Sequence, residues 1–178
     1  KDFEGSVMLR AINALATAQR VRKQKPAGDL NQIRALLELK NPAVKLAAMR
    51  LIGVWQMKKS ISLLAELATE EAEASIQSAA MQSLQEIGQP SVPAVARLVR
   101  SKNTGVRRQE VICLAALNPQ GAAKPFYHSL AEIQNEQELL DFWRQVLVKK
   151  NTGKVLAKHI PSTGITEMAA LAGLTAAR

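Results

Sequence analysis

The chain has 178 residues, a formal net charge of +9 and a pI of about 10. Its one cysteine excludes an internal disulfide framework, and no stretch approaches the roughly 20 apolar residues of a membrane-spanning helix. The positive charge favours nucleic acid, an anionic membrane surface or an acidic protein as a partner, whereas aromatic residues, at 3%, leave few anchors for a stacked ligand.

Apolar residues recur at a fixed interval, and this repeat is the main structural signal in the sequence. Three columns of positions step through the chain 31 residues at a time. They are Leu30, Ile61, Val92 and Ala123; Ile33, Leu64, Val95 and Phe126; and Leu37, Ala68, Val99 and Leu130. Repeats of this length, each with two amphipathic helices, cannot bury their apolar faces alone and must stack on their neighbours.

In chain order, we expect repeats at about residues 5–40, 41–72, 73–102 and 103–135, followed by a degenerate C-terminal cap at 136–178. Each repeat opens with a first helix whose apolar stripe begins, in turn, at Val7, Val44, Ile76 and Val106. The spacing along each stripe is helical, and no strand-like alternation is present. The first repeat is longer than the others between its two helices, and the extra residues fall in 19–28.

Local signals agree with these helices. Asn41 before Pro42 predicts a helix start, because the asparagine side chain caps free amides and proline is tolerated at the first helical position. The run 91–93, Ser-Val-Pro, predicts a second-helix start in the same way, and Gly53 and Gly88 are expected at or near the ends of first helices. Within the C-terminal cap we expect helices at 139–147, 155–160 and 165–177.

The second repeat resembles HEAT repeats, particularly the short bacterial kind. The matching residues are Asn41, Val44, Lys45, Ala47, Ala48, Met49 and Ile52. The resemblance covers Gly5 to about Ile133 and implies an all-α fold, a right-handed α-solenoid of the HEAT/armadillo type with about five helix pairs in a single domain over 1–178. The fourth repeat departs from the pattern, because Gln109 and Glu110 stand where small residues belong.

A second resemblance lies in the runs 142–144, 153–157 and 173–178. They are similar to the segment that joins HEAT-like repeats to a c-type cytochrome domain in large bacterial secreted proteins, in which a propeller similar to sugar dehydrogenases precedes the repeats. This implies a piece of a larger exported redox protein whose haem lies outside this chain, since no Cys-x-x-Cys-His occurs here. The compartment is periplasmic or exported if this resemblance holds, and cytoplasmic otherwise.

The sequence contains no catalytic constellation, so we expect no enzyme activity, metal or cofactor in this chain. His128 has Glu132 four residues on, but a metal site would need further ligands. Trp55 and Trp143 lie on helical stripes and are expected in the core. Cys113 stands in an apolar run and is expected to be buried.

We therefore expect a non-catalytic scaffold that contacts a protein or a neighbouring domain. Its basic side chains fit either an ordinary solvated surface or a contact with an acidic partner. The expected binding residues lie on second helices, which line the concave side in the resembled family: Arg34, Arg97, Arg100, Lys124, Tyr127 and His128. A basic loop is expected at Arg20, Arg22, Lys23 and Lys25. The alternative is a solenoid that binds nucleic acid with a basic concave face. Against it, the column formed by 34, 65, 96 and 127 reads Arg, Ala, Ala, Tyr and is not consistently basic.

Overall fold

The computed structural model describes residues 3–23, 29–70, 73–99, 104–147 and 152–158, and all regular structure within them is helical. The chain divides into two compact units, residues 1–94 and 95–178, which are treated separately below. Unit 1 contains α1 (Phe3–Arg22), α2 (Asn31–Ala35), η1 (Leu36–Glu38), α3 (Pro42–Val54), η2 (Lys58–Ser60), α4 (Ile61–Glu70), α5 (Ala74–Ile87) and η3 (Gln89–Ser91). Helix α6 (Val92–Leu98) spans the boundary between the units. Unit 2 contains α7 (Thr104–Leu117), α8 (Pro119–Ala131), α9 (Glu136–Val146) and α10 (Thr152–Ala157).

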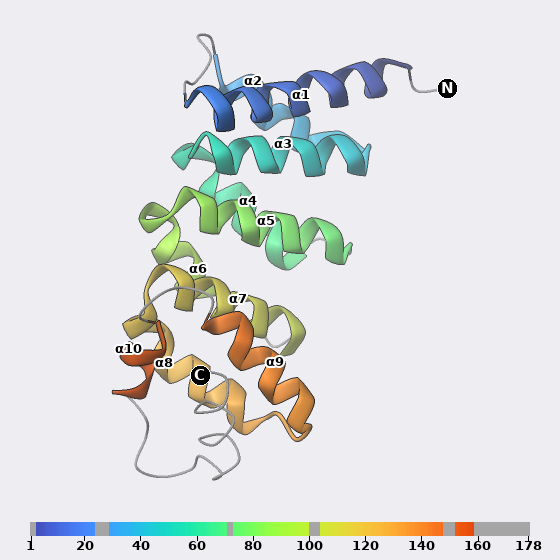
Figure 1. Ribbon diagram of the computed structural model, residues 1–178. Coiled ribbons are helices and arrows are strands. Elements are labelled where there is room, and N and C mark those ends of the chain that lie inside the picture. The colour runs from blue at the N-terminus through green and yellow to red at the C-terminus, as the bar shows by residue number, and fades with distance from the viewer. Residues whose placement is uncertain (1–2, 24–28, 71–72, 100–103, 148–151, 159–178) are drawn as a thin grey trace. The chain divides into compact units, whose positions relative to one another are not determined.

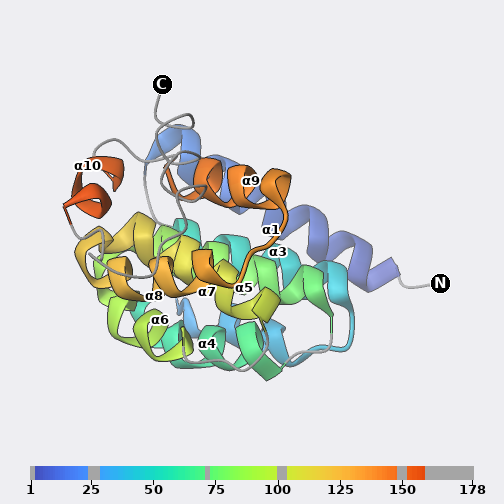
Figure 2. The same cartoon turned by 90° about the horizontal axis from the view of Figure 1, so that it is seen from below.

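The first helices of unit 1 form a stack. Helix α3 packs against α1 on one side and α5 on the other, and Figure 1 shows the three helices one below another with α1 at the outer end of the unit. Helix α4 packs against α5 and lies beside this stack rather than in line with it, as the second view shows (Figure 2). This alternation of first and second helices confirms the predicted fold class, an α-solenoid built from helix pairs.

Two of the predicted capping signals act as expected. The Asn41 side chain accepts hydrogen bonds from the amides of Ala43 (3.1 Å) and Val44 (3.3 Å) at the start of α3. Gly88 ends α5 with a φ of 86°, a conformation that glycine adopts without strain. These two signals fix the start of one first helix and the end of the next.

Ser91 acts differently from the prediction. A 3-10 turn at Gln89–Ser91 precedes α6, and the Ser91 hydroxyl donates to the carbonyls of Leu84 and Gly88, both at 2.6 Å. The serine therefore satisfies carbonyl groups at the C-terminal end of α5 instead of capping the amides of α6. Each of these carbonyls also accepts a backbone amide, Leu84 from Gly88 and Gly88 from Ser91, so the hydroxyl adds a second hydrogen bond to each at this helix end.

Helices α3 and α5 cross at close range. The Ser83 hydroxyl donates to the Met49 carbonyl at 2.8 Å, and a Cβ added at Gly53 would lie 3.0 Å from the Ser83 Cα. Gly53 lies in the last turn of α3, as expected, and the close approach of α5 leaves little room for a side chain there. The buried serine adds a hydrogen bond between the two helices.

The predicted columns supply much of the core. Leu64, Val95 and Phe126 are fully buried, and Leu37 and Ala68 are nearly so. The column that begins at Leu30 lies nearer the surface, since its first three members are half-buried. Trp55 and Cys113 are buried as expected.

Unit 2 packs around an aromatic cluster. Phe126 of α8 contacts Phe142 and Trp143 of α9, with ring centroids at 5.4 Å and 4.6 Å, and its neighbour Tyr127 at 5.2 Å. Asn118 and Asn135 cap α8 and α9 by accepting hydrogen bonds from backbone amides. The burial of Trp143 confirms its predicted core position.

The C-terminal helices differ slightly from the expected ranges. Helix α9 occupies 136–146 where 139–147 was expected, and α10 occupies 152–157 where 155–160 was expected. The helix expected at 165–177 lies outside the described residues. The predicted single domain over 1–178 stays a prediction.

Candidate functional site

A surface groove lies between α7 and α9 of unit 2, with a volume of about 520 Å³. Four side-chain amides line it, from Gln109, Asn135, Gln137 and Gln145, together with the apolar Ile112 and Phe142 and the charged Arg108, Glu138 and Asp141. Gly105 lies at the start of α7.

The charged groups at this groove form ion pairs within unit 2. Arg108 of α7 donates to Glu138 of α9, and Asp141 accepts from Arg144 at 3.0 Å. Asp141 also accepts from the Gln137 amide at 3.1 Å. Each carboxylate therefore has a cationic neighbour, so the groove presents little uncompensated charge.

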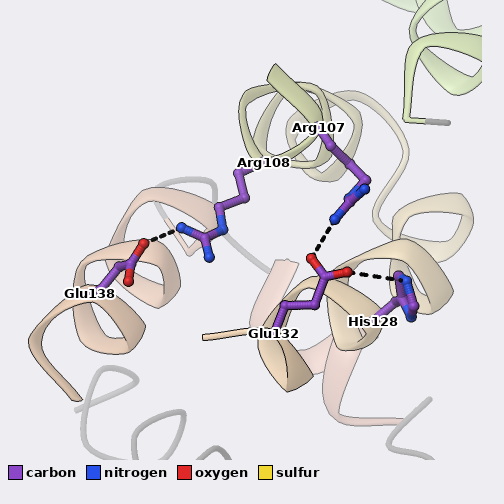
Figure 3. Close-up of polar contacts among 5 residues, drawn as sticks. All are labelled: Arg107, Arg108, His128, Glu132 and Glu138. Atoms are coloured by element: carbon purple, nitrogen blue, oxygen red, sulfur yellow. Dashed lines mark hydrogen bonds and ion pairs between the residues drawn. The ribbon is translucent and has the colours of Figure 1, made fainter. Parts of the chain in front are cut away.

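Adjacent arginines of α7 reach two different elements, as Figure 3 shows. Arg107 donates to Glu132, which follows α8, while Arg108 donates to Glu138 on α9. His128 lies 3.5 Å from the second oxygen of Glu132. Successive residues on a helix point about 100° apart, which allows one helix to hold two neighbours with consecutive side chains.

Glu110 departs from the repeat pattern in the sequence, and the structure shows the surroundings of its carboxyl group. Its side chain is fully buried, and neither carboxyl oxygen has a hydrogen-bond partner among the described residues. Burial raises the pKa of Glu110 to about 8, although the Arg107 charge acts in the opposite direction. The carboxyl group is therefore mostly protonated at neutral pH. Its position in the repeat corresponds to Ala48 and Ala80, so the break in a column of small residues was the signal.

The residues expected on the concave face divide between the two units. Arg34 on α2 is exposed in unit 1, while Arg97, Lys124 and His128 are exposed in unit 2. Arg100 lies outside the described residues. That these side chains contact a partner stays a prediction.

Tyr127 corrects one part of that expectation. It is only 6% exposed, and its hydroxyl donates to the Leu156 carbonyl at 2.7 Å. Burial also raises the pKa of Tyr127 to about 12, which keeps the hydroxyl protonated as a donor. The tyrosine joins α8 to α10 and does not present a binding surface.

The expected basic loop is also corrected in part. Arg20 and Arg22 lie in the last turn of α1, and Lys23 follows it directly. No glycine or proline interrupts the sequence before Pro26, and cationic side chains are favoured near the negative end of the helix dipole. The helix therefore includes Arg20 and Arg22, which were expected in the loop, and ends at Arg22, just before Lys23 with its φ of 56°. Lys25 lies outside the described residues.

Among the described residues, no cluster of histidine, cysteine and carboxylate side chains could hold a metal ion. In the same part of the chain, no helix combines the length and the apolar character that crossing a bilayer would require.

Comparison with known proteins gives one match. A family model for HEAT repeats matches residues 30–115, from the start of the second helix of the first repeat to the buried part of α7. No curated protein and no solved structure matches the chain.

Proposed function

Because the chain carries a HEAT-like repeat domain, we propose that it is a non-catalytic scaffold whose basic unit 1 binds an acidic segment of a protein or of a neighbouring domain. Helical repeats of this kind offer extended surfaces for contact rather than a built-in reaction centre.

The charge of unit 1 supports this proposal. Among the side chains described in residues 5–94, nine lysines and arginines are exposed, compared with four aspartates and glutamates. Among the side chains described in unit 2, by contrast, five exposed lysines and arginines are nearly balanced by four exposed aspartates and glutamates. Surface charge of one sign steers association with a partner of the opposite sign and gives the contact a strong dependence on salt.

Binding of defined probes tests the proposal. We expect a labelled poly-L-glutamate peptide to bind in fluorescence anisotropy, more weakly as salt is raised, and Arg34→Ala or the pair Arg22→Ala and Lys23→Ala to weaken binding several-fold. Arg144→Ala is the matched control, because its guanidinium already pairs with Asp141. Absence of peptide binding would refute the proposal. Tight binding of duplex DNA with a steep salt slope would favour a nucleic-acid-binding solenoid instead.

We further propose that the domain belongs to a larger exported redox protein, on the strength of the resemblance at 142–144, 153–157 and 173–178. Phe142 and Trp143 also pack in the core of unit 2, so part of this run has a structural role as well. The test is the product of the complete gene. We expect an export signal and the absorption bands of a c-type haem, and a product without Cys-x-x-Cys-His would contradict the proposal.

A further inference from the structure

Helix α1 carries a stripe of apolar side chains, Val7, Ala11, Ala14 and Leu15, which we call the outer stripe. These positions are exposed on α1 but buried in the other first helices of unit 1. Val7 is 47% exposed and Leu15 is 37% exposed. Their counterparts in α5, Ile76 and Leu84, are 3% and 0% exposed. The counterparts in α3, Val44 and Ile52, are 1% and 0% exposed. Among the described first helices of unit 1, these large apolar positions of the repeat are therefore exposed on α1 and buried on α3 and α5.

The small residues of the same stripe follow this pattern. Ala11 and Ala14 are exposed, whereas the matching Ala80 and Ser83 of α5 are buried. Ser83 lies where α5 crosses α3 at close range and donates to an α3 carbonyl. Ala14 therefore places a small side chain at the point where a preceding helix would approach α1.

The orientation of α1 is the same as that of α5. Ile12 is 3% exposed and its counterpart Met81 is 6% exposed, so both helices turn the same side toward the interior. The exposure of the outer stripe thus results from the lack of a neighbouring helix on that side within the described part of the chain, not from a rotated helix. Figure 1 shows α1 at the end of the stack, with α3 on its other side.

We propose that a further helix pair of the same repeat type packs on this stripe, defined by Val7, Ala11, Ala14 and Leu15. Its first helix would lie on α1 as α3 lies on α5, which continues the stacking interface already present in unit 1. This surface is separate from the basic side chains of the proposed function.

The charges of α1 argue against a second copy of this chain as the occupant. Arg10 and Arg22 are exposed on α1, and none of the side chains described on this helix is acidic. Two α1 helices packed face to face would bring these like charges together, which disfavours the contact.

An extended chain tests the inference. In this extended chain, a second copy of residues 41–73 replaces residues 1–4 and is joined directly to Gly5. The copy then leads into α1 as the original residues 41–73 lead into α5. The register is maintained because Glu73-Ala74-Ser75-Ile76 parallels Glu4-Gly5-Ser6-Val7. We expect the backbone amides of α1 to exchange with deuterium at least about tenfold more slowly than in the original chain, because docked helices open less often. Unchanged exchange in α1 would overturn the proposal.

Two controls keep the result specific. Val7→Gln together with Leu15→Gln should abolish the added protection in the extended chain and leave the melting temperature of the original chain nearly unchanged. Leu84→Gln, at the buried position that matches Leu15, should lower the melting temperature strongly. Sedimentation of the original chain should give a monomer. A dimer that the Val7→Gln and Leu15→Gln changes dissolve would make a second copy the occupant and overturn the proposal.

Discussion

Replacing Glu110 with glutamine should remove a large part of the pH dependence of stability in unit 2. The glutamate is fully buried, and burial raises its pKa from 4.5 to about 8. The folded state therefore holds a proton that the unfolded state releases above pH 4.5. Since the folded state binds more protons in this range, the free energy of unfolding falls as pH rises from about 4.5 to about 8.

The magnitude follows from the two pKa values. Each unit of difference between them corresponds to about 1.4 kcal/mol, so Glu110 accounts for a loss of at most about 5 kcal/mol across this range. Glutamine has nearly the same size and cannot ionise. Other titrating groups contribute equally to both proteins, so the difference between the two pH profiles isolates Glu110.

Urea unfolding at a series of pH values measures this difference. Trp143 lies in unit 2 and Trp55 in unit 1, so a Trp55→Phe background makes tryptophan emission report on unit 2. We expect the free energy of unfolding to fall steeply between pH 5 and pH 8 with glutamate at 110 and to change much less with glutamine. Parallel profiles would refute the reasoning, because they would mean that Glu110 ionises in the folded state as readily as in the unfolded chain.

Three further substitutions have defined outcomes in thermal or urea unfolding. Gly53→Ala should cost about 1 to 3 kcal/mol, because the added Cβ would lie 3.0 Å from the Ser83 backbone; a neutral effect would mean that the helices separate freely. Leu64→Ala should cost about 2 to 5 kcal/mol, since the side chain is fully buried, and a smaller loss would place it outside the core. Tyr127→Phe should cost about 1 kcal/mol through loss of the bond to Leu156; full stability would show that this bond contributes nothing.

The core could be predicted because periodicity in a repeat reports burial directly. Leu64, Val95 and Phe126 share one column and are all fully buried. Exposure of Val7 and Leu15 could not be predicted in the same way, because their pattern is the same as that of buried positions. An apolar position in the repeat indicates that the residue is suited to packing against a neighbouring helix. It does not indicate whether that helix is present.

The candidate site was less predictable, because its contacts join residues distant in sequence. Arg108 pairs with Glu138, and the Tyr127 hydroxyl reaches Leu156, 29 residues further on. No local pattern identifies such pairs. The unusual position of Glu110 was visible, but its raised pKa depends on side chains that enclose it in the folded state.

The buried thiol of Cys113 allows local opening of unit 2 to be measured without an added label. Cys113 is the one cysteine of the chain, lies in α7 and is 3% exposed. An alkylating reagent can reach the thiol only while the surrounding helices are open, so the reaction rate reports the open fraction. A single mass increment, followed in time by mass spectrometry, would thus give the opening equilibrium of α7 in the unmodified protein.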